Sequence, residues 1–463
     1  MENNVNVNEA GAAGAVRNTS NLTGAVTNSM MQSKKVTEEP VVLKDNKAPS
    51  VRFVTIGIGQ GGCKIATTLT GILPNKPFEI SINTSDQDLA QVNIPDNQKF
   101  KIGGTNANGA GKNRDRAKQY FKSFAATSNY SKESLDVLST FIGLYEEVLF
   151  NPKYQTVIIV SFTSDGGSGS GLGPMFTASL TNYVNSVSSF RFGDKDYTID
   201  DVTNSIPRPV VIAVTPKCKI DAGATSLQNA IECAKDIQTS IDAGIGTFFI
   251  ADNNLDESVS YKSTEEMYNI INSRIAAPLL KFLGIEMNSD IKCMDLQDKI
   301  NTLRIPGACS FISVSDVNLF QYVIPHGQSV TRAITMLKYD GDETAQGERE
   351  ASAKNLMRKL DVSSVDDISV FFQIDKSMLN GISSVTKELL ETSMIGLFGF
   401  KSLSAIIEEL TENLHRTLVA NDKKQNVITN NSTGFDSIKK DSAELNNRFG
   451  GKTLSQASVS DLF

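Results

Sequence analysis

Apolar and polar positions alternate along most of the chain in a pattern that predicts parallel β-strands separated by helices. The β-branched runs SVRFVTIG, FEISINT, TVIIVSF, PVVIAVTP and GTFFIAD predict buried strands. Amphipathic segments lie between them, such as SLDVLSTFIGLYEEVLF, whose apolar residues recur at i, i+3, i+4 and i+7. Regular alternation of strand and helix predicts an α/β protein with a mainly parallel sheet that has helices on both faces.

The pattern changes after a long, mostly apolar segment, STEEMYNIINSRIAAPLLKFLG, which predicts a central core helix. Beyond it, ACSFISVSD, QSVTRAITMLKY and DISVFFQID predict the strands of a smaller α/β domain, and we expect residues 383–414 to be helical. The polar residues 186–209 predict an inserted surface segment.

These changes in pattern divide the chain into five parts. We expect a flexible N-terminal tail at 1–48, a sheet domain at 49–260, a core helix at 261–285, a C-terminal domain at 286–410, and a C-terminal helix with a flexible tail at 411–463.

Composition narrows the classes of protein that fit. The 463 residues are enough for two folded domains with tails, and the net charge of −7 argues against a protein-wide grip on nucleic acid. No apolar run approaches the ~18 residues of a membrane span, and the N-terminus lacks the pattern of a secretory signal. The five cysteines form no CxxC pair, which favours buried free thiols in a reducing cytoplasm. With only two histidines, His326 and His415, histidine-based metal sites and Ser–His catalysis find little support.

Two glycine-rich turns follow predicted strands and precede predicted helices. The first, GIGQGG at 57–62, fits GxGxxG, in which backbone N–H groups and a helix N-terminus face phosphate, although a tight structural turn has the same spelling. The second is SFTSDGGSGSGLGP at 161–174. Two such turns in one parallel sheet face the same edge, which suits a diphosphate or triphosphate.

Two common phosphate-binding folds fit less well. An NAD-dependent Rossmann-type oxidoreductase, which we keep as the alternative, expects an acid at the end of the second strand, where this chain has Asn83 and Thr84. The second turn lacks the lysine of a Walker loop.

Several motifs resemble the tubulin/FtsZ superfamily of GTPases over Val51–Gly307, and more weakly to Leu410. GGSGSGLGP resembles the GGGTGTG phosphate signature, GIGQGGCKI the first phosphate loop, and GAGKN at 109–113 the γ-phosphate loop. INTSDQDL and INTLRIPG are most similar to the TubZ/PhuZ-like plasmid and phage tubulins. Asp165 departs from the pattern because it stands where the signature has its first glycine, and Ser168 replaces a threonine.

The resemblance implies GTP or GDP with Mg²⁺ as cofactors, with Gln60 close to the metal. Tyr268 would stack on the base and Asn272 would read its edge, with Asn269 as the alternative amide. Lys112 and Arg114 fit either phosphate neutralisation or a solvated surface. The residues that the resemblance assigns to nucleotide binding are Gly59, Gln60, Gly61, Gly62, Asn83, Gly109, Ala110, Gly111, Lys112, Asn113, Gly166, Gly167, Ser168, Gly169, Ser170, Gly171, Asp221, Asn253, Tyr268 and Asn272.

Asp295 and Asp298 match the loop that carries the superfamily's catalytic acids. The resemblance implies that they act on the nucleotide of the next subunit in a head-to-tail filament, so the expected partner is the protein itself. It further implies a GTPase that positions or segregates plasmid or phage DNA in a bacterial or phage-infected cytoplasm. Contact with a DNA-bound adaptor or with DNA would involve the C-terminal tail. A relative that binds nucleotide but hydrolyses it poorly is a third interpretation.

Overall fold

The computed structural model describes residues 50–73, 75–103, 108–123, 137–199, 208–219, 221–251, 260–283, 294–313, 330–338, 343–359, 367–372, 388 and 390–430. The chain divides into two units, Met1–Asn46 and Lys47–Phe463, and every described residue belongs to the second. The predicted N-terminal tail and the C-terminal residues 431–463 lie outside the described residues.

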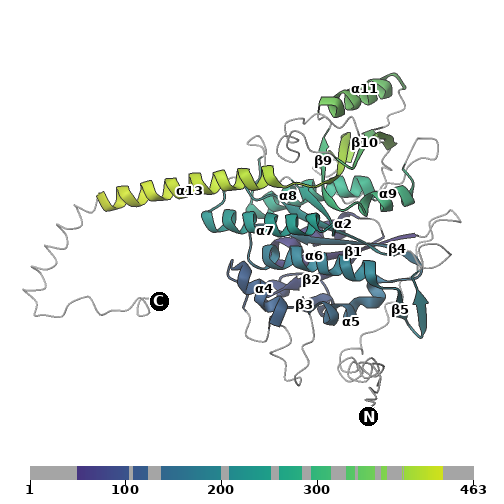
Figure 1. Cartoon of the computed structure of the whole chain (residues 1–463), viewed down its shortest axis with the longest axis horizontal. Helices are drawn as coiled ribbons and strands as arrows, with labels where there is room; N and C mark the ends of the chain where they lie inside the picture. Colours follow the sequence, from purple (N-terminus) through teal and green to yellow (C-terminus); the bar gives the residue numbers. More distant parts are fainter. Residues whose placement is uncertain are drawn as a thin grey trace, which may run out of the picture. The chain divides into compact units, whose positions relative to one another are not determined.

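Ten strands of the described residues form one sheet in the order β11-β10-β12-β9-β8-β7-β4-β1-β2-β3 (Figure 1). Their bounds are β1 Ser50–Ile58, β2 Phe78–Asn83, β3 Lys99–Lys101, β4 Tyr154–Phe162, β7 Val210–Pro216, β8 Thr247–Ala251, β9 Gly307–Ser313, β10 Arg332–Lys338, β11 Asp367–Phe372 and β12 Met394–Phe400. Strands β3 to β9 in this order pair in parallel, and β12 is antiparallel to both of its neighbours. The predicted α/β class with a mainly parallel sheet is confirmed.

The helices cover both faces of this sheet (Figure 1). Their bounds are α2 Gly59–Ile72, α3 Asp86–Ala90, α4 Arg114–Ser123, α5 Val137–Leu149, α6 Ser168–Ser186, α7 Ala224–Asp242, α8 Thr264–Leu283, α9 Leu296–Leu303, α11 Glu343–Lys359 and α13 Ser404–Asn430. Alternate strand residues point to opposite faces. Val54 and Ile56 of β1 accordingly pack in the core with α5, α6, α7 and the start of α13, whereas Phe53 packs in the core with α2, α8 and α9.

The prediction of a continuous helix over 383–414 is wrong, because its middle forms strand β12. All seven residues of MIGLFGF are buried, and they pair with β9 on one side and β10 on the other. A short apolar run has no periodicity that separates a buried strand from a buried helix. Gly396 and Gly399 disfavour a helix here, and Gly399 has a φ of 75°.

The polar insertion forms a small hairpin, β5 Ser189–Phe192 and β6 Lys195–Thr198, outside the main sheet. It is anchored by Phe190, whose ring lies 5.3 Å from that of Phe150 and 5.7 Å from that of Tyr197. Strand β8 pairs with β9, so the strands of the two expected domains belong to one continuous sheet. The domain boundaries expected from the sequence remain predictions.

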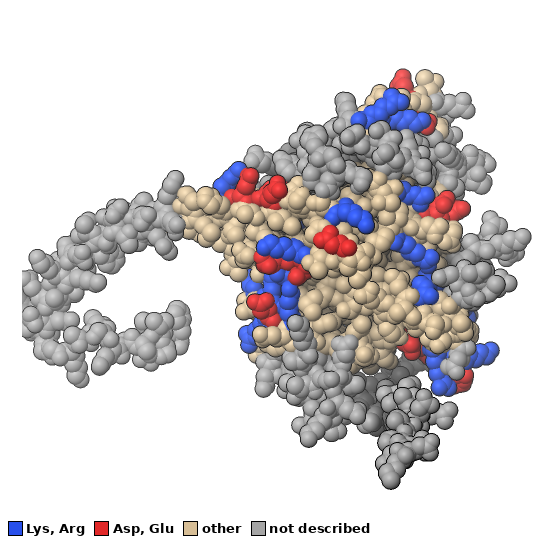
Figure 2. Space-filling view, viewed as in Figure 1, with Lys and Arg blue, Asp and Glu red and all other residues tan. Residues whose placement is uncertain are grey.

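The described residues show how the charged side chains and the cysteines are placed. Figure 2 shows basic and acidic side chains interspersed on the described part of the face in view. Cys63, Cys218, Cys233 and Cys309 are buried and free, as expected, while Cys293 lies outside the described residues. None of the helices in the described part of the chain is long and apolar enough to cross a membrane.

A buried lysine joins the core helix to the segment before β12. Lys281 of α8 is 2% exposed, and its Nζ donates to the carbonyl of Thr392 and lies 3.4 Å from the Thr392 hydroxyl oxygen. Burial, with a smaller contribution from the charge of Lys338, lowers the pKa of Lys281 to about 7. The folded protein therefore releases this proton at a pH where an unfolded chain still holds it.

We expect this lysine to make stability depend on pH between about 7 and 9. The unfolded chain keeps the proton up to about pH 10 whereas the folded chain loses it near 7, so stability from this group rises with pH over the window. The free energy of unfolding of the wild type minus that of Lys281→Met should increase by up to about 1.4 kcal/mol per pH unit. Denaturant unfolding at three pH values measures this. Lys235→Met, at an exposed lysine, is the control and should show no such trend; a Lys281→Met difference that stays flat would contradict the assignment.

Candidate nucleotide-binding site

The two glycine-rich turns meet at the carboxyl-terminal ends of neighbouring strands. Strands β1 and β4 pair in parallel with Ile58 opposite Phe162, so α2 and α6 begin side by side. Gly59 has a φ of 73°, and a Cβ added to it would lie 2.8 Å from the backbone nitrogen of Gly169. A Cβ on Gly169 would lie 3.1 Å from the carbonyl oxygen of Ile58. The contact is therefore between backbones and requires glycine.

Both of these helices begin without a side-chain cap. The residue preceding α2 is Ile58, whose side chain has no polar atom, and the residue preceding α6 is Gly167, which has no side chain. By contrast, α3 and α9 are capped by Ser85 and Asp295. The first N–H groups of an α-helix have no partner within it and carry its positive dipole end. Two such ends side by side form a site suited to phosphate.

The predicted γ-phosphate loop packs directly on the second glycine turn. Gly109, Gly111 and Lys112 adopt left-handed φ values of 90°, 59° and 58°. Asn113 then caps α4 by accepting a hydrogen bond from a backbone N–H of its first turn at 2.9 Å. A Cβ on Gly167 would lie 2.9 Å from the Lys112 Cα, so the backbone of this loop packs against the backbone of the second glycine turn. The structure thus brings three predicted phosphate segments together.

The residues that follow β2 contact the second glycine turn. Asn83 is buried, and its Oδ1 accepts hydrogen bonds from the backbone nitrogens of Thr84 and Ser85 at 2.7 and 3.3 Å. The Thr84 and Ser168 hydroxyl oxygens lie 2.7 Å apart. Asn83 therefore orders the turn, and the serine that replaces the signature's threonine supplies the hydroxyl for this bond.

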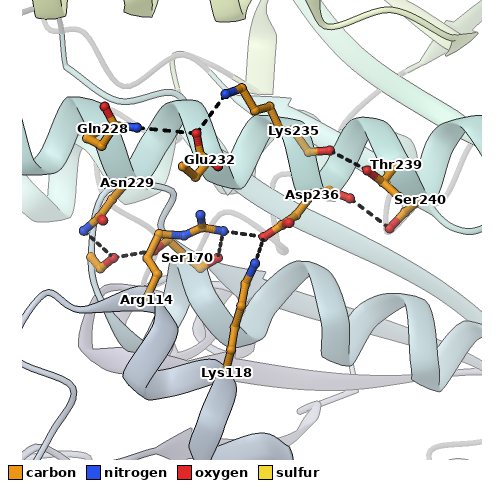
Figure 3. Close-up of polar contacts among 11 residues, drawn as sticks. Arg114, Lys118, Ser170, Gln228, Asn229, Glu232, Lys235, Asp236, Thr239 and Ser240 are labelled. Carbon is orange, nitrogen blue, oxygen red and sulfur yellow. Dashed lines mark hydrogen bonds and ion pairs between the residues drawn. The ribbon is translucent and has the colours of Figure 1, made fainter.

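Arg114 has neither of the two predicted roles. Its side chain is buried, and the guanidinium donates to the carbonyl of Ser170 at 3.0 Å and pairs with Asp236 of α7. The Lys118 Nζ also contacts Asp236, at 2.7 Å (Figure 3). Instead of facing phosphate or solvent, Arg114 joins α4, α6 and α7 behind the turns.

Charged side chains gather around Cys218, beside the second turn. The pKa of the Cys218 thiol is raised to about 12, chiefly by burial and less by the charges of Asp165 and Asp221, while the charge of Lys112 acts to lower it. The Lys112 Nζ lies 3.4 Å from the Ser226 hydroxyl oxygen. Asp165, at the unusual signature position, and Lys112 therefore both lie in the charged surroundings of Cys218.

The predicted base-contacting residues lie on α8, which packs against α2. Tyr268 is 42% exposed, and the Lys64 Nζ lies 5.2 Å from its ring centroid. Asn272, one turn further, is buried. The Gln60 side chain is exposed, with Nε2 3.5 Å from the Gln91 Oε1. Asn253 lies outside the described residues.

The two predicted catalytic acids are apart from these turns. Asp295 and Asp298 are exposed at the start of α9, and Asp295 Oδ1 accepts a hydrogen bond from the Asp298 backbone nitrogen at 2.7 Å. The end of α9 lies at the amino-terminal edge of the sheet, since the Leu303 carbonyl accepts a hydrogen bond from Thr247, the first residue of β8. An eight-residue helix spans about 12 Å, about half the length of a seven-residue strand. The acids therefore do not reach the glycine turns of their own chain.

Sequence reasoning missed a residue that joins two of the loops. The Asn229 side chain of α7 donates to the carbonyls of Lys112 at 2.9 Å and Gly166 at 3.1 Å. No local motif marks it, because SLQNAIECAKDI has the pattern of an ordinary amphipathic helix. Among the described residues, no group of three or more histidine, cysteine, aspartate or glutamate side chains forms a metal cluster.

No protein-family model and no curated protein sequence matches the chain. Its fold is shared with solved structures of TubZ proteins. TubZ of Clostridium botulinum phage c-st, in a form truncated at its C-terminal tail, superposes with a TM-score of 0.52 at 15% identity, covering 80% of this chain and 98% of that one.

Two other TubZ structures have the same fold. The TubZ-Bt two-stranded filament gives a TM-score of 0.56 at 12% identity, covering 88% of this chain and 94% of that one. A GTPγS-form protofilament of TubZ from Bacillus thuringiensis serovar israelensis gives 0.54 at 13% identity, covering 82% and 94%. The fold that the sequence resemblance implies is confirmed; the individual site residues remain predictions.

Alanine substitutions at two glycines of α2 should change the free energy of unfolding in opposite directions, because only Gly59 takes part in the backbone contact. Gly59→Ala should lower the free energy of unfolding by more than about 1 kcal/mol, since it strains a left-handed residue and forces a Cβ against Gly169. Gly71→Ala should raise it by about 0.5–1 kcal/mol, because Gly71 is helical and has open space around it. Denaturant unfolding of both variants measures this. Equal effects of the same sign would show that Gly59 is not held by the contact.

Proposed function

We propose that this protein is a GTP-dependent, filament-forming protein of the tubulin type that hydrolyses GTP between subunits. The observation that carries the proposal is the meeting of three glycine-containing segments at one sheet edge, with two uncapped helix N-termini among them. TubZ proteins of the same fold form a two-stranded filament and a GTPγS-form protofilament, which supports extending the proposal to assembly.

The nucleotide would lie across this edge. The first turns of α2 and α6 fit the inner phosphates, because each presents N–H groups over glycines that leave the backbone accessible. The loop 109–113 fits the terminal phosphate, since it packs on the second turn. Tyr268 has enough exposed surface to stack on a base, and Asn272 is placed one turn along the same helix. These residues would hold GTP or GDP.

The residues present fit a magnesium ion bound mainly through phosphate. Mg²⁺ in nucleotide sites keeps several waters and takes one or two protein ligands besides phosphate oxygens. The described residues offer scattered oxygen donors, among them Gln60 and the Thr84 and Ser168 hydroxyls, rather than an acidic cluster. Bound there, the ion would neutralise charge on the phosphates.

Asp295 and Asp298 would act on the nucleotide of the adjacent subunit. They lie on α9, which ends at the amino-terminal edge of the sheet, and the glycine turns lie at the carboxyl-terminal edge, so head-to-tail stacking would bring acids and nucleotide together. A carboxylate placed there would orient or deprotonate the attacking water. A contact of this kind does not close on itself, which is why it produces filaments.

We extend the proposal to a cytoplasmic role in positioning or segregating plasmid or phage DNA, with adaptor or DNA contact through the C-terminal tail. The support is the resemblance of INTSDQDL and INTLRIPG to the plasmid and phage branch. The NAD-dependent alternative gains no support from the described residues, since Asn83 uses its side chain to order its own turn.

Removing either carboxylate should greatly slow turnover and preserve nucleotide binding. Asp298→Asn and Asp295→Asn both remove a charge, and asparagine is as good an N-cap as aspartate, so α9 keeps its start. We expect kcat to fall by at least about 100-fold, within the range of losses for a group acting on water, with GTP affinity unchanged. Gln297→Ala, an exposed neighbour on the same helix, is the control. Loss of GTP binding in the acid variants would contradict action between subunits.

The rate of GTP hydrolysis per subunit should rise with protein concentration. The complete site would exist only where two subunits meet, so the activity per subunit should be near zero below an assembly threshold and constant well above it. Phosphate release measured over a hundredfold concentration range, with light scattering in parallel, tests this. A specific activity independent of concentration would show a site complete within one chain.

A further inference from the structure

One buried amide bridges the loop 109–113 and the second glycine turn. The side-chain nitrogen of Asn229 donates to the carbonyl oxygens of Lys112 at 2.9 Å, Gly166 at 3.1 Å and Asp165 at 3.3 Å. Asn229 is 8% exposed, so these bonds are shielded from water. An amide NH₂ has two hydrogens, and its three acceptors here come from two loops 53 residues apart in sequence, counting from Lys112 to Asp165.

The bridge lies where the two loops touch. A Cβ on Gly167 would be 2.9 Å from the Lys112 Cα and 3.0 Å from the Asn113 nitrogen, so there is no slack between the loops at this point. Lys112 itself has a left-handed φ of 58°, a conformation that costs a lysine free energy and needs support from its surroundings. The hydrogen bond from Asn229 to its carbonyl supplies part of that support.

The helix that carries Asn229 is itself held by polar contacts further along its length, among them those of Asp236 (Figure 3). Asp236, seven residues along and so on the same face, pairs with Arg114 and with Lys118. Further along, Gln238 Nε2 donates to the Lys401 carbonyl at 2.7 Å, on the segment that leads into α13. Asn229 therefore projects from a rigid support, which is what a group that sets the position of two loops requires.

We propose that Asn229 is a positioning residue that holds the loop 109–113 against the second glycine turn and thereby sets the preference for a nucleoside triphosphate over a diphosphate. The inference rests on the proposed function, in which that loop faces the terminal phosphate. The inner phosphates lie on the turns of α2 and α6, which contact each other without Asn229. Loss of the amide therefore weakens the grip on the terminal phosphate more than the grip on the rest of the nucleotide.

The test compares the affinities of GTPγS and GDP by equilibrium titration. Asn229→Ala removes all three hydrogen bonds, although the Gly166 carbonyl still accepts one from the Ser170 hydroxyl, and Asn229→Ser keeps one O–H donor. Gln228→Ala, at the exposed neighbour whose side chain contacts Glu232 on the same helix at 3.4 Å, is the matched control. Thermal unfolding without nucleotide is measured for all of them, and nucleotide affinities are compared at a temperature where each is folded.

We expect Asn229→Ala to weaken GTPγS binding by about tenfold or more and GDP binding by less than about threefold, with Asn229→Ser between it and the wild type. Gln228→Ala should keep the wild-type ratio. Equal losses for both nucleotides, or no loss, would overturn the inference and leave Asn229 with a purely structural role. Should Asn229→Ala fail to fold, the ratio for Asn229→Ser decides alone. A wild type that binds neither nucleotide would instead overturn the proposed function.

Discussion

The close approach of two backbones at Gly59 and Gly169 is the constraint on which the rest of the site depends. It arises because β1 and β4 are neighbours in a parallel sheet, so the helices after them begin at the same edge. Side chains at these positions would separate the helix starts, since the added Cβ atoms would meet backbone at 2.8 and 3.1 Å. With glycine there, two positive helix ends lie together, an arrangement that is unfavourable until an anion joins them.

The polar groups behind the turns determine geometry more than stability. Arg114 is buried and pairs with the half-buried Asp236 and the Ser170 carbonyl, and such a pair contributes little net stability because the desolvation of the guanidinium offsets the attraction. What it does provide is a fixed distance between α4, α6 and α7. The Arg114 contacts hold α4 against α6 and α7, and Asn229 of α7 bonds to the Lys112 carbonyl. Together these bonds fix the position of the loop that precedes α4.

Elements that depend on a local residue pattern can be predicted from the sequence, whereas elements and side-chain roles that depend on tertiary contacts cannot. The strands and both glycine turns follow from apolar runs and glycine spacing, and the turns meet as a parallel sheet requires. The roles of Arg114 and Asn229 could not be predicted, because their partners lie 122 and 117 residues away in sequence. Strand β12 was missed for a related reason: its seven apolar residues become a strand only because β9 and β10 stand open on either side.

Under the proposed function, the separation of the acids from the glycine turns would make assembly part of the chemistry. Hydrolysis needs a group that positions water at the terminal phosphate, and the acids proposed for this role stand on α9, which ends at the opposite edge of the sheet. A monomer of this fold would therefore bind nucleotide without an efficient means of cleaving it. A second copy stacked edge to edge would supply the missing carboxylates, and its own turns would stay free for the next copy. Under the proposed function, hydrolysis would then report on the contact between subunits, so the same contact that builds a filament would also limit its lifetime.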